Sequence, residues 1–207
     1  MKVLAIGAHF DDVELGCGGS LWKHYQNNDD LYILVVTQSD YYSEETHHKR
    51  TKQEALEEGK KAACLIKAHL IIGNFKSLEL VASRELINYL CRIISEVKPD
   101  VVYTHFAGDQ HLDHKAIGEA SIIATRKVNQ VYAYISNVYE TSPVFSPNCF
   151  VDISEEFEYK IQLVECYQSE KKTHPRWREQ LTYFNGIYGI KNRVDYVEPF
   201  QVIRILK

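Results

Sequence analysis

A short segment near the N-terminus, residues 8–12, constrains the fold of this chain more than any other feature of the sequence. It reads Ala-His-Phe-Asp-Asp, follows the apolar run at residues 3–6 and precedes a stretch of small residues at 16–20. An unbroken apolar run is typical of a strand that is buried on both faces of a parallel sheet. The segment is therefore predicted to form the turn from such a strand into a helix. This turn lies at the carboxyl edge, where open α/β sheets bind their ligands.

The side chains of this turn are of the kind that binds metal ions. His9 can ligate a divalent ion together with Asp11 or Asp12, which leaves the other aspartate free to handle a proton. An ordinary loop whose aspartates cap the next helix is the alternative interpretation. One histidine and one carboxylate are too few ligands for a catalytic metal site, so the chain must supply a third from elsewhere.

A second cluster of the same chemistry lies about a hundred residues further along. Residues 111–114 read His-Leu-Asp-His and follow an apolar, strand-like run at residues 100–106. His111 and His114 are three residues apart, so both can lie on one face at the start of a helix. Two clusters that meet at one sheet edge are how a metal site is commonly assembled. The second cluster therefore favours a metal site over an ordinary loop.

The rest of the chain alternates between strand-like and helix-like patterns. Apolar runs near residues 2–8, 31–37, 69–73, 101–106 and 131–138 predict strands, and helical periodicity is found at 54–65, 86–97 and around Phe157, Ile161 and Val164. Strands that alternate with helices predict an α/β fold with a Rossmann-like, mostly parallel sheet and helices on both faces. No linker or repeat interrupts the pattern, so we expect residues 1–207 to form a single domain.

Charge and hydropathy exclude several classes of partner. The net charge of −4 is spread along the chain without a basic patch, which argues against nucleic acid as a partner. The apolar runs are too short to span a membrane, and the chain begins with a strand rather than a signal peptide. We therefore expect a soluble, cytoplasmic protein, with a homo-oligomer left open. The five cysteines form no Cys-x-x-Cys pair, and Cys17 alone stands close enough to the first motif to be considered as an alternative metal ligand.

The two motifs resemble those of the PIG-L/LmbE-like family of zinc-dependent de-N-acetylases. The usual motifs of that family are Ala-His-Pro-Asp-Asp-Glu and His-x-Asp-His, and the similarity extends to residues 18–21, 99–102, 151–154 and 196–200. Phe10 stands where the family commonly has proline, and the first motif continues with Val13 and Glu14 rather than directly with glutamate. Neither change removes a metal-binding atom, so both bear on the geometry of the turn rather than on its chemistry.

The resemblance implies a role for each motif residue. It implies that His9, Asp12 and His114 bind zinc, that Asp11 is the general base, and that His111 polarises the amide or protonates the leaving amine. Elementary chemistry agrees, because catalytic zinc commonly has three protein ligands and makes its water acidic near neutral pH. Amide hydrolysis then needs a proton acceptor and a donor near the developing negative charge.

Two further residues are candidates for supporting roles. Asp113 lies between the two histidines and is expected to act in catalysis by raising the pKa of His111; the alternative is a helix cap. Arg50 follows a polar loop that leaves the same sheet edge. Because family members often use an arginine soon after this loop to hold substrate, Arg50 is the candidate substrate-binding residue, and a solvated charge is the alternative.

The predicted function is hydrolysis of the N-acetyl group of an amino sugar of the N-acetylglucosamine type, or of a small sugar conjugate. The substrate class comes from the resemblance, whereas the residues themselves indicate metal-assisted hydrolysis. Two histidines and one carboxylate also match Fe²⁺ sites, so the ligands alone leave the metal open. A non-catalytic nucleotide-sugar-binding or regulatory module and a metal-dependent phosphoesterase remain alternatives. The phosphoesterase would need a second metal or extra basic residues.

Overall fold

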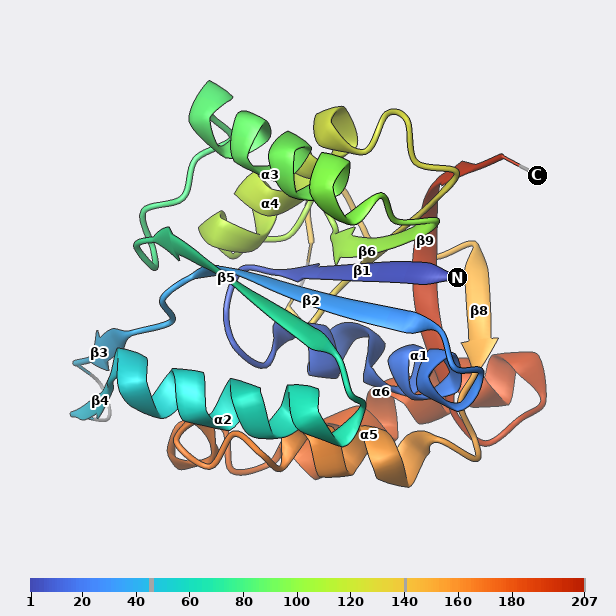
Figure 1. Ribbon diagram of the computed structural model, residues 1–207. Coiled ribbons are helices and arrows are strands. Elements are labelled where there is room, and N and C mark those ends of the chain that lie inside the picture. Colours follow the sequence, from blue (N-terminus) through green and yellow to red (C-terminus); the bar gives the residue numbers. More distant parts are fainter. Residues whose placement is uncertain (45–46, 140, 207) are drawn as a thin grey trace.

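A seven-stranded sheet forms the centre of the molecule (Figure 1). The computed structural model describes residues 1–44, 47–139 and 141–206. The strand order is β5-β2-β1-β6-β7-β9-β8, and a separate two-stranded sheet pairs β3 with β4. The strands are β1 (Lys2–Gly7), β2 (Asp30–Thr37), β3 (Tyr41–Ser43), β4 (His48–Arg50), β5 (His69–Phe75), β6 (Val101–His105), β7 (Gln130–Tyr134), β8 (Cys149–Asp152) and β9 (Val197–Ile205).

Five neighbouring strands, from β5 to β7, run parallel, which confirms the predicted fold class. Strand β1 lies between β2 and β6, so it is covered on both edges as well as on both faces. Strands β9 and β8 are antiparallel additions beyond β7. The sequence pattern did not reveal these two strands, and β7 ends at Tyr134 rather than at residue 138.

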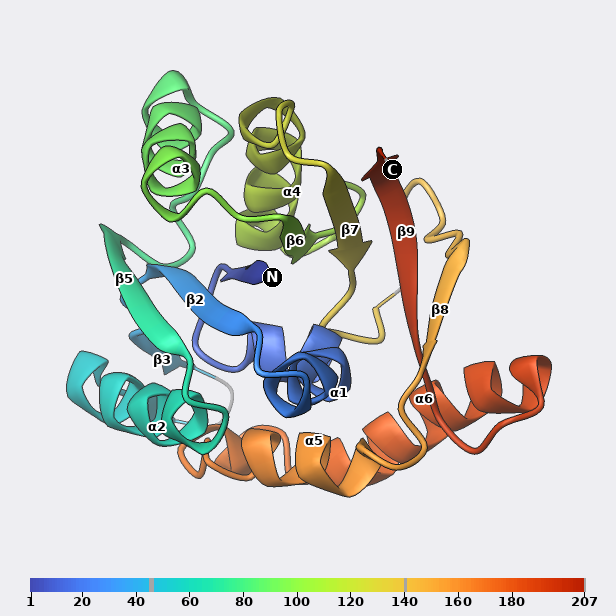
Figure 2. The same ribbon diagram turned by 45° about the vertical axis from the view of Figure 1, so that its right-hand side comes forward.

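Helices cover both faces of the sheet (Figures 1 and 2). Side chains of β1 alternate between two apolar clusters: Val3 and Ala5 pack with α1, α2 and α5, whereas Leu4 and Ile6 pack with α3 and α4. The helices are α1 (Asp12–Gln26), α2 (Lys52–Leu65), α3 (Arg84–Val97), α4 (Leu112–Ala124), α5 (Phe157–Val164) and α6 (Trp177–Asn192), with a 3₁₀ turn at Glu170–Lys172. None of the helices in the described part of the chain is both long and apolar enough to cross a membrane.

Helix α1 contains a break that is filled by a buried ion pair. Cys17 has non-helical dihedral angles (φ −141°, ψ 20°) and divides the helix into two segments. The Glu198 carboxylate accepts the N–H groups of Gly19 and Ser20 at the start of the second segment, at 2.8 and 2.7 Å. The Lys160 ammonium donates to Glu198 and to the carbonyl of Leu15, the last turn before the break. The pair thus satisfies backbone groups that the break exposes.

Three chain segments meet at the carboxyl edge of the parallel strands. The β1–α1 turn and the β6–α4 loop leave neighbouring strands there, and the β3–β4 hairpin follows β2 and projects beyond the same edge (Figure 1). We had expected a polar loop where the hairpin forms. The topology therefore brings both sequence motifs to one place.

Candidate metal centre

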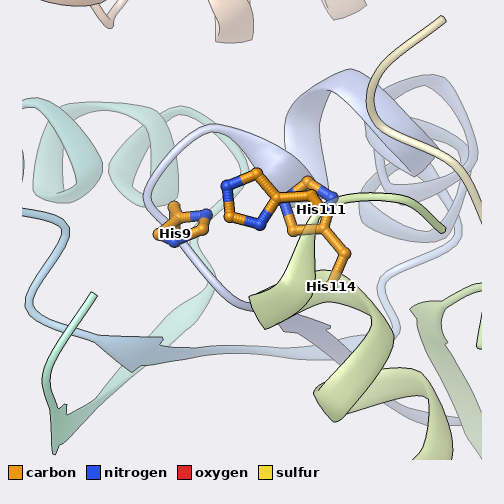
Figure 3. Close-up of side chains that lie close together, drawn as sticks. All are labelled: His9, His111 and His114. Atoms are coloured by element: carbon orange, nitrogen blue, oxygen red, sulfur yellow. The ribbon is translucent and has the colours of Figure 1, made fainter. Parts of the chain in front are cut away.

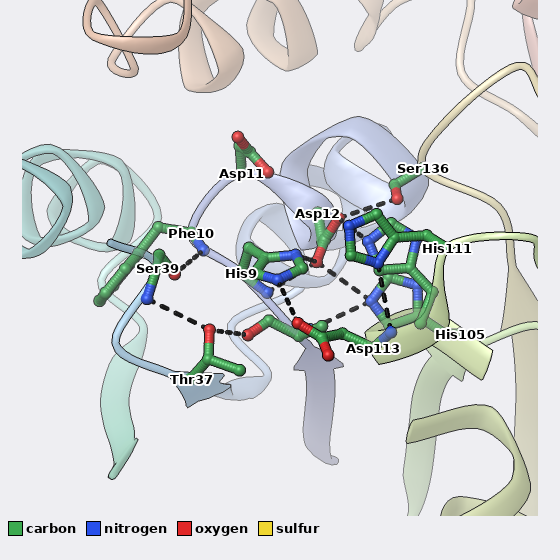
Figure 4. Close-up of polar contacts among 12 residues, drawn as sticks. His9, Phe10, Asp11, Asp12, Thr37, Ser39, His105, His111, Asp113 and Ser136 are labelled. Carbon is green, nitrogen blue, oxygen red and sulfur yellow. Dashed lines mark hydrogen bonds and ion pairs between the residues drawn. The ribbon is translucent and has the colours of Figure 1, made fainter. Parts of the chain in front are cut away.

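The β1–α1 turn separates the two aspartates of the first motif (Figure 4). Asp11 is the N-cap of α1 and has a positive φ of 117°, a conformation that non-glycine residues rarely adopt. As a result its carboxylate points away from the histidines, whereas that of Asp12 points toward them. Asp12 is buried and accepts hydrogen bonds from the backbone N–H of His9 at 2.7 Å and the hydroxyl of Ser136 at 2.9 Å.

His9 is held between two carboxylates. Its Nε2 lies 2.8 Å from Asp113, and its Nδ1 faces Asp12 at 3.4 Å. Asp113 is itself fixed, because it accepts the backbone N–H groups of Leu78 and Leu80 at 2.6 and 3.0 Å. A carboxylate on one ring nitrogen orients a histidine so that the other nitrogen is available to a metal. The available atom of His9 is therefore Nδ1.

His114 has the same arrangement with the nitrogens exchanged. Its Nδ1 lies 3.2 Å from Asp109, and its Nε2 faces the second oxygen of Asp12 at 3.1 Å. Asp109 is also positioned by the backbone N–H of His111, at 2.8 Å. The available atom of His114 is therefore Nε2. The carboxylates of Asp109 and Asp113 play matching parts on the two imidazoles.

These donor atoms suit a divalent metal ion. Two imidazole nitrogens face the two oxygens of one carboxylate, and each ring is oriented from behind by a second carboxylate. Nitrogen and carboxylate oxygen are donors that zinc prefers. The nitrogens of His9, His111 and His114 also lie within 4.8 Å of one another (Figure 3), and a second group of this kind contains Asp12, His105 and His114. Cys17 belongs to neither group and is fully buried in the core.

His111 lies beside this cluster and is the N-cap of α4. Its Nδ1 accepts the backbone N–H of Asp113 at 3.2 Å, so the proton of a neutral His111 is on Nε2. Burial, followed by the charges of His114 and His9, lowers its pKa to about 4. The charge of Asp113 acts to raise the pKa of His111, as expected, but burial outweighs it and the net shift is downward. The Asp113 carboxylate itself is directed at His9. The cap of α4 is His111 rather than Asp113.

The cluster opens into a pocket of about 370 Å³. The lining comprises His9, Asp11, Asp12, Leu15, Ser39, Tyr41, Tyr42, Arg50, Ser77, Leu78, His111, His114, Asn137, Tyr139, Glu170, Thr173, His174 and Trp177. Burial, and then the negative charges of Glu170 and Asp12, raise the pKa of Asp11 well above its usual value. A carboxylate whose pKa is raised toward neutrality is a better proton acceptor for a hydrolytic step.

Arg50 lines the pocket, but its guanidinium group is already paired. Only 1% of the residue is exposed. Its nitrogens lie 2.9 Å from Glu170, 3.2 Å from Glu58 and 3.8 Å from Asp11, and one of them donates to the carbonyl of Phe10 at 3.2 Å. The arginine therefore binds the elements around Asp11 together.

Comparisons with known proteins agree with this geometry. The model of the PIG-L family, GlcNAc-PI de-N-acetylase, matches residues 4–125, which contain both motifs. The chain belongs to the PIG-L family. The uncharacterized deacetylase YaiS of Escherichia coli (strain K12) is 33% identical over 161 residues, covering 75% of this chain and 83% of that protein. The diacetylchitobiose deacetylase of Thermococcus kodakarensis is 25% identical, and the match covers 98% of this chain and 83% of that protein.

A solved structure shares the fold of this chain. The conserved protein TT1542 from Thermus thermophilus matches with a TM-score of 0.82 and 25% identity, over 96% of this chain and 93% of that one. The predicted family is confirmed by the family model and by the relative from Escherichia coli.

Three residues around the candidate metal centre were not predicted from the sequence. Asp109 lies five residues before His114, a spacing that allows contact across the start of α4. His105 is a fully buried imidazole in an apolar strand, which is itself a signal; its Nε2 lies 3.1 Å from the N–H of Ala8 and 3.2 Å from Asp12. Glu170 comes from a segment without any motif.

Proposed function

We propose that this protein is a zinc-dependent hydrolase that removes the acetyl group from the nitrogen of an N-acetylated amino sugar or small sugar conjugate. One observation carries the proposal. His9 Nδ1 and His114 Nε2 face the two oxygens of Asp12, whereas the neighbouring Asp11 is turned into the pocket by a strained backbone. Strain of this kind persists where the surrounding structure enforces it, often at a functional site. The turn thus separates Asp12, the proposed metal ligand, from Asp11, the proposed general base.

In this scheme His9, Asp12 and His114 hold the ion. A bound divalent ion supplies Lewis-acid chemistry, because it polarises a carbonyl group and makes water acidic near neutral pH. Asp11 accepts the proton of the attacking water as the water oxygen bonds to the acetyl carbon. The bond between carbon and nitrogen then breaks, the nitrogen receives a proton, and acetate and a free amine leave. The raised pKa of Asp11 suits it to accept that proton and to return it.

His111 completes the scheme as a neutral hydrogen-bond donor. Its Nδ1 is occupied by the backbone N–H of Asp113, so Nε2–H is the group that faces the acetyl oxygen as negative charge develops there. A pKa lowered to about 4 keeps the ring neutral at physiological pH. Between the two roles considered for His111, polarisation of the amide is therefore favoured over protonation of the amine.

The substrate class is supported by the relatives and by the size of the pocket. Two relatives are named as deacetylases, and one of these as a diacetylchitobiose deacetylase. A pocket of about 370 Å³ lies at the small end of the range for small-molecule sites. The lining offers hydroxyl and amide groups from Ser39, Ser77 and Asn137, which suit the hydroxyl groups of a sugar.

The test combines metal analysis with acetate release from a panel of N-acetyl sugars. We expect one equivalent of zinc and acetate release from at least one neutral N-acetyl sugar. Asp11→Asn is expected to keep the metal and to lose about 10²- to 10⁴-fold in turnover, since it replaces a proton acceptor by a group of the same shape. Loss of metal in that variant would make Asp11 a ligand. A metal-loaded protein that binds these sugars without releasing acetate would favour the binding-module alternative.

A further inference from the structure

We propose that Glu170 sets the charge preference of this pocket, so that the preferred substrates are uncharged N-acetyl glycosides and not phosphorylated or nucleotide-linked ones. The inference rests on the proposed function and goes beyond it, because it selects among N-acetyl sugars. Its basis is the environment of Arg50, the residue otherwise best suited to hold a phosphate.

More carboxylates lie beside the guanidinium group of Arg50 than its single positive charge can neutralise. Glu170, Glu58 and Asp11 all lie within 4.0 Å of its nitrogens, at 2.9, 3.2 and 3.8 Å. One positive charge therefore faces three negative ones. A phosphate brought to Arg50 would meet this surplus of negative charge, and like charges placed together at a binding site suppress the wrong ligand.

Arg50 is also unable to turn toward a ligand at low cost. Glu170 is 5% exposed and Glu58 is 8% exposed, so a departing arginine would leave two buried acids without their cation. Glu58 is further fixed by the N–H and hydroxyl of Ser169, at 2.7 and 2.6 Å. Glu170 accepts the hydroxyl of Tyr41 at 3.0 Å. Both acids are thus held in place by hydrogen bonds, and Glu170 lines the pocket.

The other described residues of the lining do not restore a positive charge. Apart from histidines, Arg50 is the only basic side chain among them. Asp12 adds a fourth carboxylate and a bound divalent ion adds two positive charges, so one negative charge still remains in excess. What remains for a substrate is a set of uncharged groups, including Ser39, Ser77 and Asn137. Such groups pair with sugar hydroxyls without a charge on either side.

The experiment compares two substrates that differ in one substituent. We would measure kcat/KM for methyl N-acetyl-α-glucosaminide and for N-acetyl-α-glucosamine 1-phosphate with the zinc-loaded protein. The wild type is expected to prefer the methyl glycoside by at least about 100-fold, because like charges placed together at a binding site disfavour the phosphate. Glu170→Gln is expected to reduce this ratio at least about tenfold. Glutamine can still accept hydrogen bonds from Tyr41 and Thr173 while it removes the charge.

Glu165→Gln is the matched control. Glu165 carries the same charge and lies five residues away, where it is exposed and pairs with Lys171 outside the pocket lining. The substrate ratio is expected to stay unchanged in this variant. Equal or better use of the phosphate by the wild type would overturn the inference, as would a ratio that Glu170→Gln leaves unchanged.

Binding of the deacetylated products separates this inference from the proposed function. Calorimetry with methyl α-glucosaminide and α-glucosamine 1-phosphate measures the charge preference without any turnover, and it needs only the wild type. If neither N-acetyl compound releases acetate, the proposed function fails, while tighter binding of methyl α-glucosaminide, which has the same amine and lacks the phosphate, still supports the inference. Tighter binding of the phosphate would refute the inference even in an active enzyme.

Discussion

The buried pair of Glu198 and Lys160 makes a quantitative prediction about stability. Glu198 is fully buried and accepts hydrogen bonds from the backbone N–H groups of Gly19 and Ser20 at the break in α1. Substitution Glu198→Ala removes the acceptor of these two groups and of the Ser20 hydroxyl. Among the described residues, it leaves the Leu15 carbonyl as the remaining acceptor for the ammonium of Lys160. Several buried donors would thus lose their partner in one change.

The expected loss is about 3–5 kcal/mol in the free energy of unfolding, the usual cost of removing one partner of a buried ion pair. For a chain of this length each kcal/mol lowers the melting temperature by about 2–4 °C, so the melting temperature is expected to fall by about 6–20 °C. Because the break in α1 directly follows the turn that carries the two aspartates, metal affinity is expected to fall as well.

Thermal and urea unfolding of the metal-free protein measure this effect. Glu158→Ala is the matched control, because the pair of Glu158 and Arg178 has a similar distance of 2.8 Å but is exposed on both sides, and it is expected to cost under about 1 kcal/mol. The double substitution Lys160→Met with Glu198→Gln should recover part of the loss by removing both charges. A loss below about 1 kcal/mol in Glu198→Ala would refute the idea that this pair supports the helix break.

Three further predictions concern the site itself. Asp11→Gly should be more stable than Asp11→Asn by about 1–3 kcal/mol in the free energy of unfolding, because glycine adopts the positive φ of this position without strain. Equal melting temperatures of the two variants would show that the turn is unstrained. Asp109→Asn and Asp113→Asn should each weaken zinc binding by about 10- to 100-fold in a competitive chelator titration, and unchanged affinity would remove their orienting role. His111→Ala should lower kcat far more than metal occupancy, and equal loss of both would make His111 a ligand.

The predictable part of this protein is the part that its short-range pattern encodes. Apolar runs with helical segments between them predicted the parallel strands, because the runs of β1, β2 and β6 are largely buried on both faces. The convergence of residues 8–12 and 111–114 followed from the rule that parallel strands end at one edge. Strand β9 was missed because it runs antiparallel near the end of the sheet, where Ile205 is 45% exposed and the pattern is mixed.

The partners of the site residues were beyond the reach of sequence spacing. Asp113 is adjacent to His114 in sequence and two residues from His111, yet it contacts His9, which lies 104 residues away. Likewise, Arg50 forms an ion pair with Glu170, which lies 120 residues further along the chain, and no sequence motif indicates this pair. Such contacts depend on how loops pack against one another, and the spacing of residues within a motif does not encode that packing.

The most direct measurement is a crystal structure of the zinc-loaded protein with anomalous data at the zinc edge. We predict one ion at about 2.0–2.2 Å from His9 Nδ1, His114 Nε2 and a carboxylate oxygen of Asp12, with Asp11 outside the ligand set. An ion held instead by His105 together with Asp12 and His114, or an ion ligated by Asp11, would contradict the central claim that this turn separates a metal ligand from a catalytic base.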